Sequence, residues 1–402
     1  MQYLVVGDGV AGHTAAETIR GEDEDADIRV FTDEDVPFYD RIGLRDYIRG
    51  GRTEEELVLE DEDWYDDRDI ALHLGTEIVG IDPDAHTVVT ADGDEYSYDK
   101  LLLAVGGRPR TVPMEEGVGK VHHLWTLDGH GRGLRRDLQA AGDGVVIGGG
   151  LLGFDLIGSF NEAVDATYLV REDRWWHSVL TPAGARIVHD AMEQHGVELR
   201  LQEECTGMES RDGQVRLTTN TTVHETDVVG IAVGHERNLG LARDAGLETG
   251  RGIRCDGTLQ TSDPDIYVAG DAAEYYDPVL ERRNLGGSWI TAQEQGAVAG
   301  RNMAGDSEQL DFVDTYTVTH FGLNVASLGD PAETDGTILT AVDEEAGTYR
   351  KVVVEDGRIV GAAIIGAMQW MHPLKQLIRQ KVDVSGAVDD LEDAGFDPAD
   401  LL

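Results

Sequence analysis

Residues Gln2–Gly12 read QYLVVGDGVAG, and residues Gly144–Gly153 read GVVIGGGLLG. Each segment is a short β-branched run that leads into a glycine loop of the form GxGxxG, and a helix-like stretch follows each loop. A second apolar run comes next in both places, at Asp27–Phe31 and at Ala166–Val170. A strand, a glycine loop, a helix and a second strand make the unit that binds a dinucleotide, so the repeat predicts two such folds in one chain.

The three glycines of each loop have different physical tasks. The first allows a tight turn, the second lets the backbone approach a pyrophosphate, and the third lets helix and strand pack closely. Asp33 stands at the end of the strand after the first loop, about 20 residues beyond it, where a carboxylate would hold ribose hydroxyls. A solvated loop acid is the alternative for Asp33. The candidate glycines are Gly7, Gly9 and Gly12 in the first loop and Gly148, Gly150 and Gly153 in the second.

The chain has 402 residues, which is enough for two or three domains. From about Leu310 the pattern changes to alternating strands, and an amphipathic helix follows near Pro373–Lys381, which predicts a separate α+β domain. The acidic tail, Asp389–Leu402, is expected to form a short helix on the surface. The expected domains are a discontinuous first one over 1–113 and 235–306, an inserted second one over 114–234, and a C-terminal one over 307–402.

The charge of the chain is strongly negative, because 33 Lys and Arg face 78 Asp and Glu, for a formal net charge of −45. Such a surface repels polyanions, which excludes non-specific nucleic-acid binding. Molar salt shortens the Debye length to about 3 Å and screens the self-repulsion. Lysine is rare, with five in the chain. We therefore predict a halophilic protein; disorder is the disfavoured alternative, since apolar runs with strand and helix periods continue throughout.

The two cysteines, Cys205 and Cys255, are far apart and match neither a CxxC nor a metal-ligand spacing. The histidines show no HxxxH or HExxH pattern, so no metal site is expected. No apolar run is long enough to cross a membrane, and Met1 leads directly into a strand without a signal segment. These features predict a cytoplasmic protein without a membrane partner, a structural disulfide or a redox dithiol.

Four segments carry a resemblance to a known family. The run IRVFTDEDVPFYDRIGL (Ile28–Leu44) resembles the first FAD-contacting stretch of the pyridine-nucleotide-dependent flavoprotein reductases, in the branch of rubredoxin and ferredoxin reductases and nitrite reductase large subunits. The likeness continues in LLLAVGGRPR (Leu101–Arg110), TSDPDIYVAGDAAE (Thr261–Glu274) and GSWITAQEQGAVAG (Gly287–Gly300). It implies an α/β protein with two Rossmann-like domains in the glutathione reductase arrangement and a small C-terminal α+β domain. FAD would bind the first fold, and NADH or NADPH the second.

The resemblance also implies which residues contact the flavin. Arg41, which follows Tyr39, matches an arginine that contacts the FAD pyrophosphate. Asp271 matches the acid that binds the ribityl chain or phosphate, and Trp289 falls beside the isoalloxazine ring, where we expect a catalytic role. The remaining implied cofactor-binding residues are Ala104, Gly106, Gly234, Gly270 and Gln295.

Two residues decide the expectation for the nicotinamide nucleotide. Asp155 occupies the place where many relatives carry a Glu near the nicotinamide, which makes it a catalytic candidate; a helix first-turn acid favoured by the macrodipole is the alternative. Arg171 stands where NAD users carry an acid, and a guanidinium there suits a 2′-phosphate. NADPH is therefore favoured, although Glu172 and Asp173 weaken the case and NADH stays open. The run Trp175–His177 is expected to be a packing patch.

The run at residues 39–47, YDRIGLRDY, lacks the cysteine of disulfide- and peroxide-reducing members, and it places Arg45 or Asp46 where ferredoxin-reductase relatives often carry a lysine. We expect a hydride to pass from NAD(P)H to FAD and electrons to leave to an external acceptor, an iron–sulfur protein of ferredoxin or rubredoxin type or a reductase partner. A homodimer through the C-terminal domain is also allowed. The alternatives are a flavin-binding regulatory protein with slow turnover and an NAD(P)H oxidase that uses oxygen.

Overall fold

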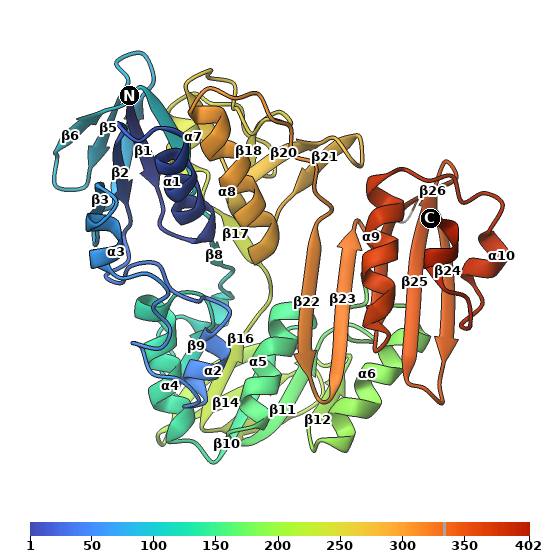
Figure 1. The fold of residues 1–402 in the computed structure, drawn as a ribbon. Helices are drawn as coiled ribbons and strands as arrows, with labels where there is room; N and C mark the ends of the chain where they lie inside the picture. The colour runs from blue at the N-terminus through green and yellow to red at the C-terminus, as the bar shows by residue number, and fades with distance from the viewer. Residues whose placement is uncertain (333–334) are drawn as a thin grey trace. The chain divides into compact units, whose positions relative to one another are not determined.

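The computed structural model describes residues 1–332 and 335–402, which form two compact units (Figure 1). The first dinucleotide-type fold lies in unit 1, whereas the second one and the C-terminal sheet both lie in unit 2. Unit 1 comprises Met1–Asp40, Glu55–Arg108 and Glu236–Asp314, and unit 2 comprises Arg41–Glu54, Pro109–His235 and Thr315–Leu402.

A parallel sheet with the strand order β19-β7-β1-β2-β3 forms the centre of unit 1. Its central strand is nearly all buried, as parallel strands covered on both faces are. Helices α1 (Val10–Glu22) and α8 (Trp289–Met303) lie side by side (Figure 1). They can approach closely because Gly296 has no side chain; a Cβ at that position would lie 2.3 Å from the Ala11 carbonyl oxygen. The strands are β1 (Gln2–Val6), β2 (Asp27–Phe31), β3 (Ile70–His73), β7 (Lys100–Leu103) and β19 (Ile266–Val268).

Smaller elements complete unit 1, among them two three-stranded sheets, β4-β5-β6 and β18-β20-β21. Strand β8 (Gly107–Pro109) pairs with β17 (His235–Arg237) at residues where the chain passes from one unit to the other. The other bounds are α3 (Glu62–Asp66), β4 (Ile78–Asp82), β5 (Thr87–Thr90), β6 (Glu95–Ser97), α7 (Gly240–Asp244), β18 (Ile253–Arg254), the 3₁₀ turn η3 (Gly270–Ala272), β20 (Ala273–Asp277) and β21 (Arg282–Leu285).

The second parallel sheet, in unit 2, has the order β12-β11-β10-β16-β9 and repeats the first in its details. The Gly7 amide donates to the Phe31 carbonyl at 2.7 Å, and the Gly148 amide donates to the Leu169 carbonyl at 3.1 Å. The elements are α2 (Leu44–Ile48), β9 (Val121–His123), α4 (Arg132–Gln139), β10 (Asp143–Ile147), α5 (Leu151–Asn161), β11 (Asp165–Val170), α6 (Pro182–Gln194), β12 (Glu198–Leu201), β13 (Cys205–Arg211), β14 (Gln214–Thr219), β15 (Val223–Thr226) and β16 (Val228–Ile231).

The C-terminal part of unit 2 is a five-stranded antiparallel sheet, β22-β23-β26-β25-β24, with helix α9 packed on it (Figure 1). Helix α9 buries Pro373, Leu374, Leu377 and Ile378, as its amphipathic pattern predicts. The bounds are β22 (Thr315–His320), β23 (Leu323–Gly329), β24 (Thr337–Asp343), β25 (Thr348–Glu355), β26 (Arg358–Ile365) and α9 (Met371–Arg379).

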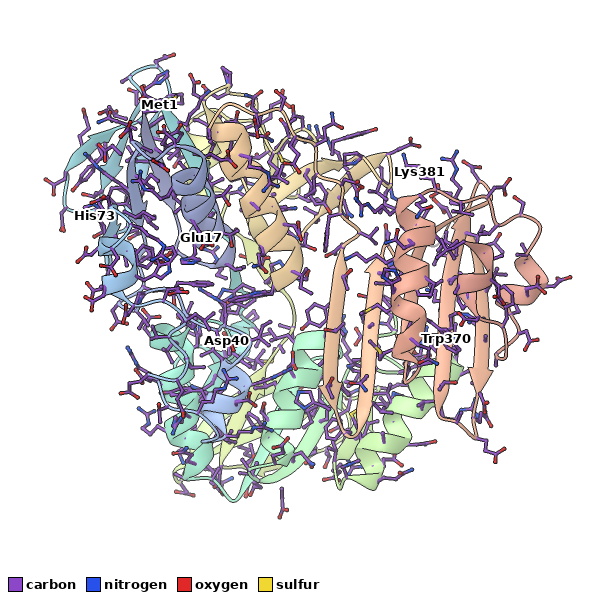
Figure 2. The ribbon with its side chains drawn as sticks, viewed as in Figure 1. Met1, Glu17, Asp40, His73, Trp370 and Lys381 are labelled. Atoms are coloured by element: carbon purple, nitrogen blue, oxygen red, sulfur yellow. The ribbon has the colours of Figure 1, made fainter. Side chains whose placement is uncertain are left out.

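The acidic tail, which was expected to form a short surface helix within Asp389–Leu402, is helical over a shorter stretch than that range. It has only the short α10 (Val388–Leu391) and a 3₁₀ turn near its end, and Leu391 is fully buried. The cause is Arg350, a fully buried side chain that donates to the backbone carbonyls of Leu391, Asp393 and Phe396. Its guanidinium also lies over Trp370, which is labelled in Figure 2. A buried cation needs acceptors, so the tail backbone folds around it instead of pairing with itself.

Two parallel dinucleotide-type sheets and a five-stranded antiparallel sheet with its packed helix are the main layers of the described residues, and smaller sheets accompany them. The predicted class is therefore confirmed: an α/β protein with two Rossmann-like domains and a small C-terminal α+β domain.

Candidate functional site

The first glycine loop has one position that is open and two that are closed. Gly7 has φ +107°, and a Cβ there would meet the Ala104 carbonyl oxygen at 2.3 Å. A Cβ on Gly12 would meet the Gly7 carbonyl oxygen at 1.9 Å, whereas one on Gly9 would meet nothing within 4 Å. Helix α1 begins after Gly9 without a side-chain cap. Gly7 and Gly12 are thus required by the packing of the chain, while Gly9 and the helix terminus leave room and N–H donors for a phosphate.

The second loop, in unit 2, has the same division. Gly148 has φ +128°, and a Cβ there would lie 2.1 Å from the Ala232 carbonyl oxygen. A Cβ on Gly153 would lie 2.0 Å from the Gly148 carbonyl oxygen, and one on Gly150 would again meet nothing within 4 Å. Helix α5 also starts from its glycine without a side-chain cap. Both loops therefore fit a dinucleotide pyrophosphate.

A buried amide without a partner lies near the first loop in unit 1. Gln295 is fully buried, and its Oε1 accepts a hydrogen bond from the Gly270 amide at 2.8 Å. Its Nε2 has no hydrogen-bond partner among the described residues. A buried donor without an acceptor costs about 1–3 kcal/mol. The orphaned amide is therefore an observation, independent of the glycine loop, that the residues here fit a polar ligand such as FAD.

The remaining candidates of unit 1 lie at the ends of strands. The Ala104 amide donates to the Val6 carbonyl at 2.8 Å, which places it directly after β7. Gly106 has φ +55°, and its carbonyl accepts from the Asn238 amide at 3.1 Å. Asp271 is half-buried in η3, after β19. Asp33 is exposed just beyond β2, and no hydrogen bond or ion pair links it to another described residue.

A row of stacked rings runs from Trp289 through Phe38 to His13, which directly follows the first glycine loop. It lies against Phe38 with ring centroids 5.7 Å apart, and Phe38 stacks on His13 at 4.0 Å. The Tyr65 hydroxyl donates to Asp8 Oδ1 at 2.8 Å and lies 2.9 Å from His13 Nδ1. Because that hydroxyl donates its proton to the carboxylate, Nδ1 is the donor in the second contact. Burial lowers the pKa of His13 to about 4, with the Arg68 charge acting in the same direction.

Sequence reasoning missed this Asp8–Tyr65–His13 group. The signal was present in part, since an aspartate stands inside the first glycine loop and a histidine follows it directly. Tyr65 lies far along the chain on α3, and nothing in its local pattern indicated the contact.

Asp155 in unit 2 is the centre of a polar cluster. This buried carboxylate accepts hydrogen bonds from Arg45 Nη1 at 3.1 Å, His320 Nε2 at 3.0 Å and Tyr316 Oη at 3.2 Å. Burial raises the pKa of Tyr316, and the Asp155 charge raises it further, so the phenol stays a donor. The structure thus settles which residue of the 39–47 run lies beside Asp155: it is Arg45, whereas Asp46 pairs with Arg49.

The three donors around Asp155 come from distant parts of the sequence. Arg45 lies on α2, and Tyr316 and His320 lie on β22 of the C-terminal sheet. Gly158 on α5 leaves room for the His320 imidazole, because a Cβ at Gly158 would lie 2.2 Å from His320 Nδ1. Sequence reasoning missed Tyr316 and His320, since neither belongs to a recognisable motif.

The end of β11 carries both a cation and an anion. The Arg171 side chain is 68% exposed and donates to Glu172 Oε1 at 2.9 Å. The Glu172 side chain is only 21% exposed, and its Oε2 would lie 3.5 Å from a Cβ on Gly149. A carboxylate therefore lies beside the second glycine loop, with a guanidinium next to it on the outside.

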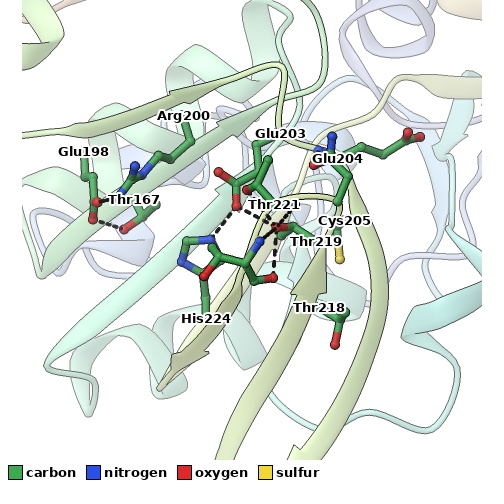
Figure 3. Close-up of polar contacts among 12 residues, drawn as sticks. Thr167, Glu198, Arg200, Glu203, Glu204, Cys205, Thr218, Thr219, Thr221 and His224 are labelled. Carbon is green, nitrogen blue, oxygen red and sulfur yellow. Dashed lines mark hydrogen bonds and ion pairs between the residues drawn. The ribbon is translucent and has the colours of Figure 1, made fainter.

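A network of buried hydrogen bonds around Glu203 supports the end of β11 (Figure 3). The Glu203 carboxylate accepts from His224 Nε2 and from Thr219 Oγ1, both at 2.7 Å. Burial acts to raise the pKa of Glu203, but the hydrogen bonds from His224 and the threonines outweigh it, so the pKa is lowered. The Glu203 amide donates to the Val170 carbonyl at 3.2 Å. The network thereby holds the turn after β12 against the end of β11, which carries Arg171.

Of the Trp175–His177 run, which was predicted to be a packing patch, the two tryptophans are buried, whereas His177 is exposed. Trp175 is fully buried against Phe154, and its Nε1 donates to the Gly150 carbonyl at 3.2 Å, which supports the second glycine loop.

Two further cofactor-binding candidates, Gly234 and Arg41, also lie in unit 2. Gly234 has φ +101° and accepts from the Arg110 amide at 3.0 Å, and Arg41 Nη1 donates to the Trp125 carbonyl at 3.3 Å.

Neither thiol is poised for chemistry. Cys205 and Cys255 are free, and burial raises the pKa of each. Among residues 1–332 and 335–402, no helix combines the length and the apolar character that crossing a membrane requires.

Comparison with known proteins agrees with this geometry. The family model "Pyridine nucleotide-disulphide oxidoreductase" matches residues 1–296, and "Rubredoxin NAD+ reductase C-terminal domain" matches residues 317–382. The anthranilate 1,2-dioxygenase system ferredoxin–NAD(+) reductase component of Burkholderia cepacia is 29% identical over 94% of this chain and 93% of its own length.

One further curated relative and one solved structure are also similar to this chain. The nitrite reductase [NAD(P)H] of Bacillus subtilis is 29% identical over 96% of this chain, which spans only 48% of that protein's length. The putidaredoxin reductase of a covalent putidaredoxin reductase–putidaredoxin complex superposes with a TM-score of 0.91 at 25% identity, covering 100% of this chain and 97% of that one. Because the first family model covers well over half of the sequence, the chain belongs to the pyridine nucleotide-disulphide oxidoreductase family.

Proposed function

We propose that this chain is an FAD-dependent NAD(P)H oxidoreductase that takes a hydride from NAD(P)H and delivers electrons to an iron–sulfur protein of ferredoxin or rubredoxin type. The observation that carries the proposal is the pair of glycine loops, each closed at its first and third glycine and open at its second. Two open loops in one chain suit two dinucleotides: FAD, which would stay bound, and NAD(P)H, which would bind and dissociate in each turnover.

The flavin supplies the redox chemistry when it is bound, since it accepts a hydride and can return electrons singly. The chain contributes binding and orientation. Gly7, Gly9 and Gly12 and the start of α1 would hold the FAD pyrophosphate, with Gln295 and Asp271 toward the rest of the cofactor. In unit 2, Asp155 would orient the nicotinamide end of the donor, because a carboxylate fixed by three donors has little freedom to move.

The acceptor is proposed to be external. The run at residues 39–47 has no cysteine, and both thiols of the chain have a raised pKa, which disfavours the reactive thiolate that a redox cysteine beside the flavin requires. Several relatives are named for reducing ferredoxin or rubredoxin. These observations support a small iron–sulfur partner over a disulfide or a peroxide.

We propose NADPH as the preferred donor. Arg171 supports it, because an exposed guanidinium at the end of β11 can turn toward a 2′-phosphate. The neighbouring Glu172 carboxylate acts in the opposite direction, since it would repel that phosphate and could instead accept from a ribose hydroxyl. The preference is therefore expected to be modest.

The proposal is tested by an anaerobic titration of the purified protein in molar salt, in which the visible flavin band is followed during addition of NADPH and then of NADH. Rapid bleaching by either nucleotide supports the hydride pathway, and the faster one identifies the donor. A flavin that neither nucleotide reduces would overturn it. A second reading, in air, separates the alternatives: fast NAD(P)H consumption without a carrier indicates an oxidase, and a stable charge-transfer band with slow turnover indicates a regulatory flavoprotein.

We also propose that the protein works in the cytoplasm of a halophile. The support is its charge of −45 and its two unpaired thiols. Unfolding followed from low salt to molar KCl should show stability rising steeply with salt; full stability in salt-free buffer would contradict it. The domain limits of 113/114, 234/235 and 306/307 and a homodimer through the C-terminal domain are proposed likewise, and limited proteolysis and sedimentation test them.

A further inference from the structure

Arg237 is a guanidinium in unit 1 whose hydrogen-bonding capacity is only partly used. It ends β17, and its Nη2 donates to the Gly286 carbonyl at 3.3 Å. Its Nε is buried and has no hydrogen-bond partner among the described residues. Burial lowers the pKa of Arg237, with Asp271 and Glu274 acting against that shift and Arg251 adding to it. A cation is thus held in a poorly solvated place, and one of its buried donors, Nε, has no partner among the described residues.

The surroundings of Arg237 are those assigned to the flavin. The next residue, Asn238, donates from Nδ2 to the Val105 carbonyl at 2.8 Å and from its amide to the Gly106 carbonyl, which fixes the backbone beside that loop. Gly286, which accepts from the guanidinium, also adjoins Gln295, because a Cβ on Gly286 would lie 3.5 Å from Gln295 Nε2. Two buried, unused donors, Arg237 Nε and Gln295 Nε2, therefore flank one glycine.

Both unused donors point to a ligand with acceptor atoms. Gly286 leads through Ser288, the N-cap residue of α8, to Trp289, so the start of this helix lies next to them in sequence. Asp271 supplies one negative charge near Arg237, but the open Nε still requires an acceptor. A carbonyl or an anionic ring edge would satisfy it.

We propose that Arg237 donates to the polar edge of the isoalloxazine ring and stabilises the negative charge that this ring gains when it is reduced. The inference rests on the proposed function only in that FAD is the ligand of unit 1. A neutral ring that receives a hydride, which carries one proton and two electrons, becomes an anion while the nicotinamide is oxidised. The charge spreads over the N1 and C2 carbonyl edge, and a fixed cation in a site that excludes water stabilises it strongly.

The chain would thereby set the driving force of its own reduction. A reduced ring stabilised tenfold relative to the oxidised ring has a two-electron potential about 30 mV higher. Arg237 would make FAD easier to reduce without touching the nicotinamide. It is a residue for tuning the cofactor, and hydride transfer itself does not pass through it.

The test uses the FAD-loaded protein with Arg237→Gln and Arg237→Lys, and with Arg251→Gln as the control. Arg251 is an exposed arginine in the same electrostatic neighbourhood. The midpoint potential is measured by equilibration with reference dyes, and the affinity for sulfite, which adds to flavin N5 and leaves the same negative ring, is measured by titration. R237Q should lose at least tenfold in sulfite affinity and have a lower potential, R237K should fall between, and R251Q should match the parent.

Unchanged potential and sulfite affinity in R237Q would overturn the inference, and so would loss of FAD in R237Q with parental values in R237K. If R237Q does not take up FAD, Arg237→His provides the test, because its potential should rise more steeply than the parent's as the pH falls through the imidazole pKa near 6.5. A parallel slope would overturn the proposal. Neither measurement uses NAD(P)H, so a parent that NAD(P)H cannot reduce would refute the proposed function and leave this inference standing.

Discussion

His320 Nε2 lies 3.0 Å from Asp155 Oδ1, and this contact joins strand β22 of the C-terminal sheet to helix α5. Gly158, three residues after Asp155 on the same helix, leaves the space that the imidazole fills. The carboxylate proposed to face the nicotinamide is thus held in part by a sheet that belongs to a separate family model. The C-terminal domain is therefore expected to contribute to hydride transfer as well as to contacts with partners.

Removal of this support should slow flavin reduction. Asp155→Asn should lower the rate of hydride transfer on the order of 100-fold, because a small displacement of the reacting groups costs that much. His320→Gln should have a smaller effect of about 10-fold, since Arg45 and Tyr316 still hold the carboxylate. Stopped-flow bleaching of the flavin by NAD(P)H under anaerobic conditions measures both rates.

His372→Gln is the matched control, because His372 is an exposed histidine on α9. It should leave the rate unchanged. Equal rates in D155N, H320Q and the parent would contradict a role for the cluster in orienting the donor.

The open glycine of the second loop offers a way to separate the two nucleotides. Gly150→Val should fold normally, because a Cβ at that position meets nothing within 4 Å. It should nevertheless raise the KM for NAD(P)H at least tenfold, since the added methyl groups would occupy the space proposed for the pyrophosphate. FAD content, read from the visible spectrum, should stay at the parental level.

Two further variants serve as comparisons for Gly150→Val. Gly153→Ala should prevent stable folding, because its Cβ would lie 2.0 Å from a backbone oxygen. Gly21→Val, at an exposed glycine of α1 that is equally unobstructed, should change neither KM nor FAD content. A parental KM in G150V would place the pyrophosphate elsewhere.

The choice of donor should respond to the charge of Glu172. Glu172→Gln should improve kcat/KM for NADPH by about 10-fold, because it removes a repelling carboxylate from beside the second loop and frees Arg171. The value for NADH should stay the same or fall. Steady-state kinetics with both donors measures the ratio.

Arg171→Gln should shift the ratio in the opposite direction. Arg186→Gln serves as a control of equal charge change, because Arg186 is an exposed arginine on α6. If the ratio moved alike in R171Q and R186Q, the effect would come from overall charge, and Arg171 would not be the 2′-phosphate residue.

His13 should make the stability of unit 1 depend on pH. Its folded pKa is about 4, below its ordinary value of 6.5, because burial disfavours the charged ring. Between these values the unfolded state takes up a proton that the folded state does not, so stability falls as the pH drops from 6.5 toward 4. The full loss is about 3 kcal/mol.

The measurement is the free energy of unfolding of the parent and of His13→Gln between pH 7 and pH 4.5, in molar salt. The difference between the two curves removes the carboxylates, which titrate in both proteins. The parent should lose more stability than H13Q over this interval. Parallel curves would show that the ring is not held neutral in the folded state.

The sequence made the local parts of the fold predictable. Gly7, Gly12, Gly148 and Gly153 stand where any Cβ would strike a backbone oxygen, and such steric demands leave a fixed spacing in the chain. Helix α9 was predictable for a similar reason, since its buried residues recur with the helical period.

Contacts over long distances in the sequence were not predictable. Asp155 and His320 are 165 residues apart, and neither has a neighbour that indicates the other. The acidic tail Asp389–Leu402 was predicted to be a short surface helix, and nothing in its own residues indicated that Arg350, buried on β25, binds the carbonyls of Leu391 and Phe396. Such contacts depend on tertiary packing, and a single sequence gives no periodic sign of them.

Arg350 also constrains the order in which the chain can mature. Its guanidinium sits in the interior of the C-terminal sheet, but its acceptors are the carbonyls of Leu391, Asp393 and Phe396, all of which lie more than forty residues further along the chain. While the ribosome is still synthesising that stretch, the arginine would have to be buried without acceptors, which is costly. The sheet is therefore expected to close late, after residue 396 has emerged, and truncation before that point should yield chains that the cell degrades.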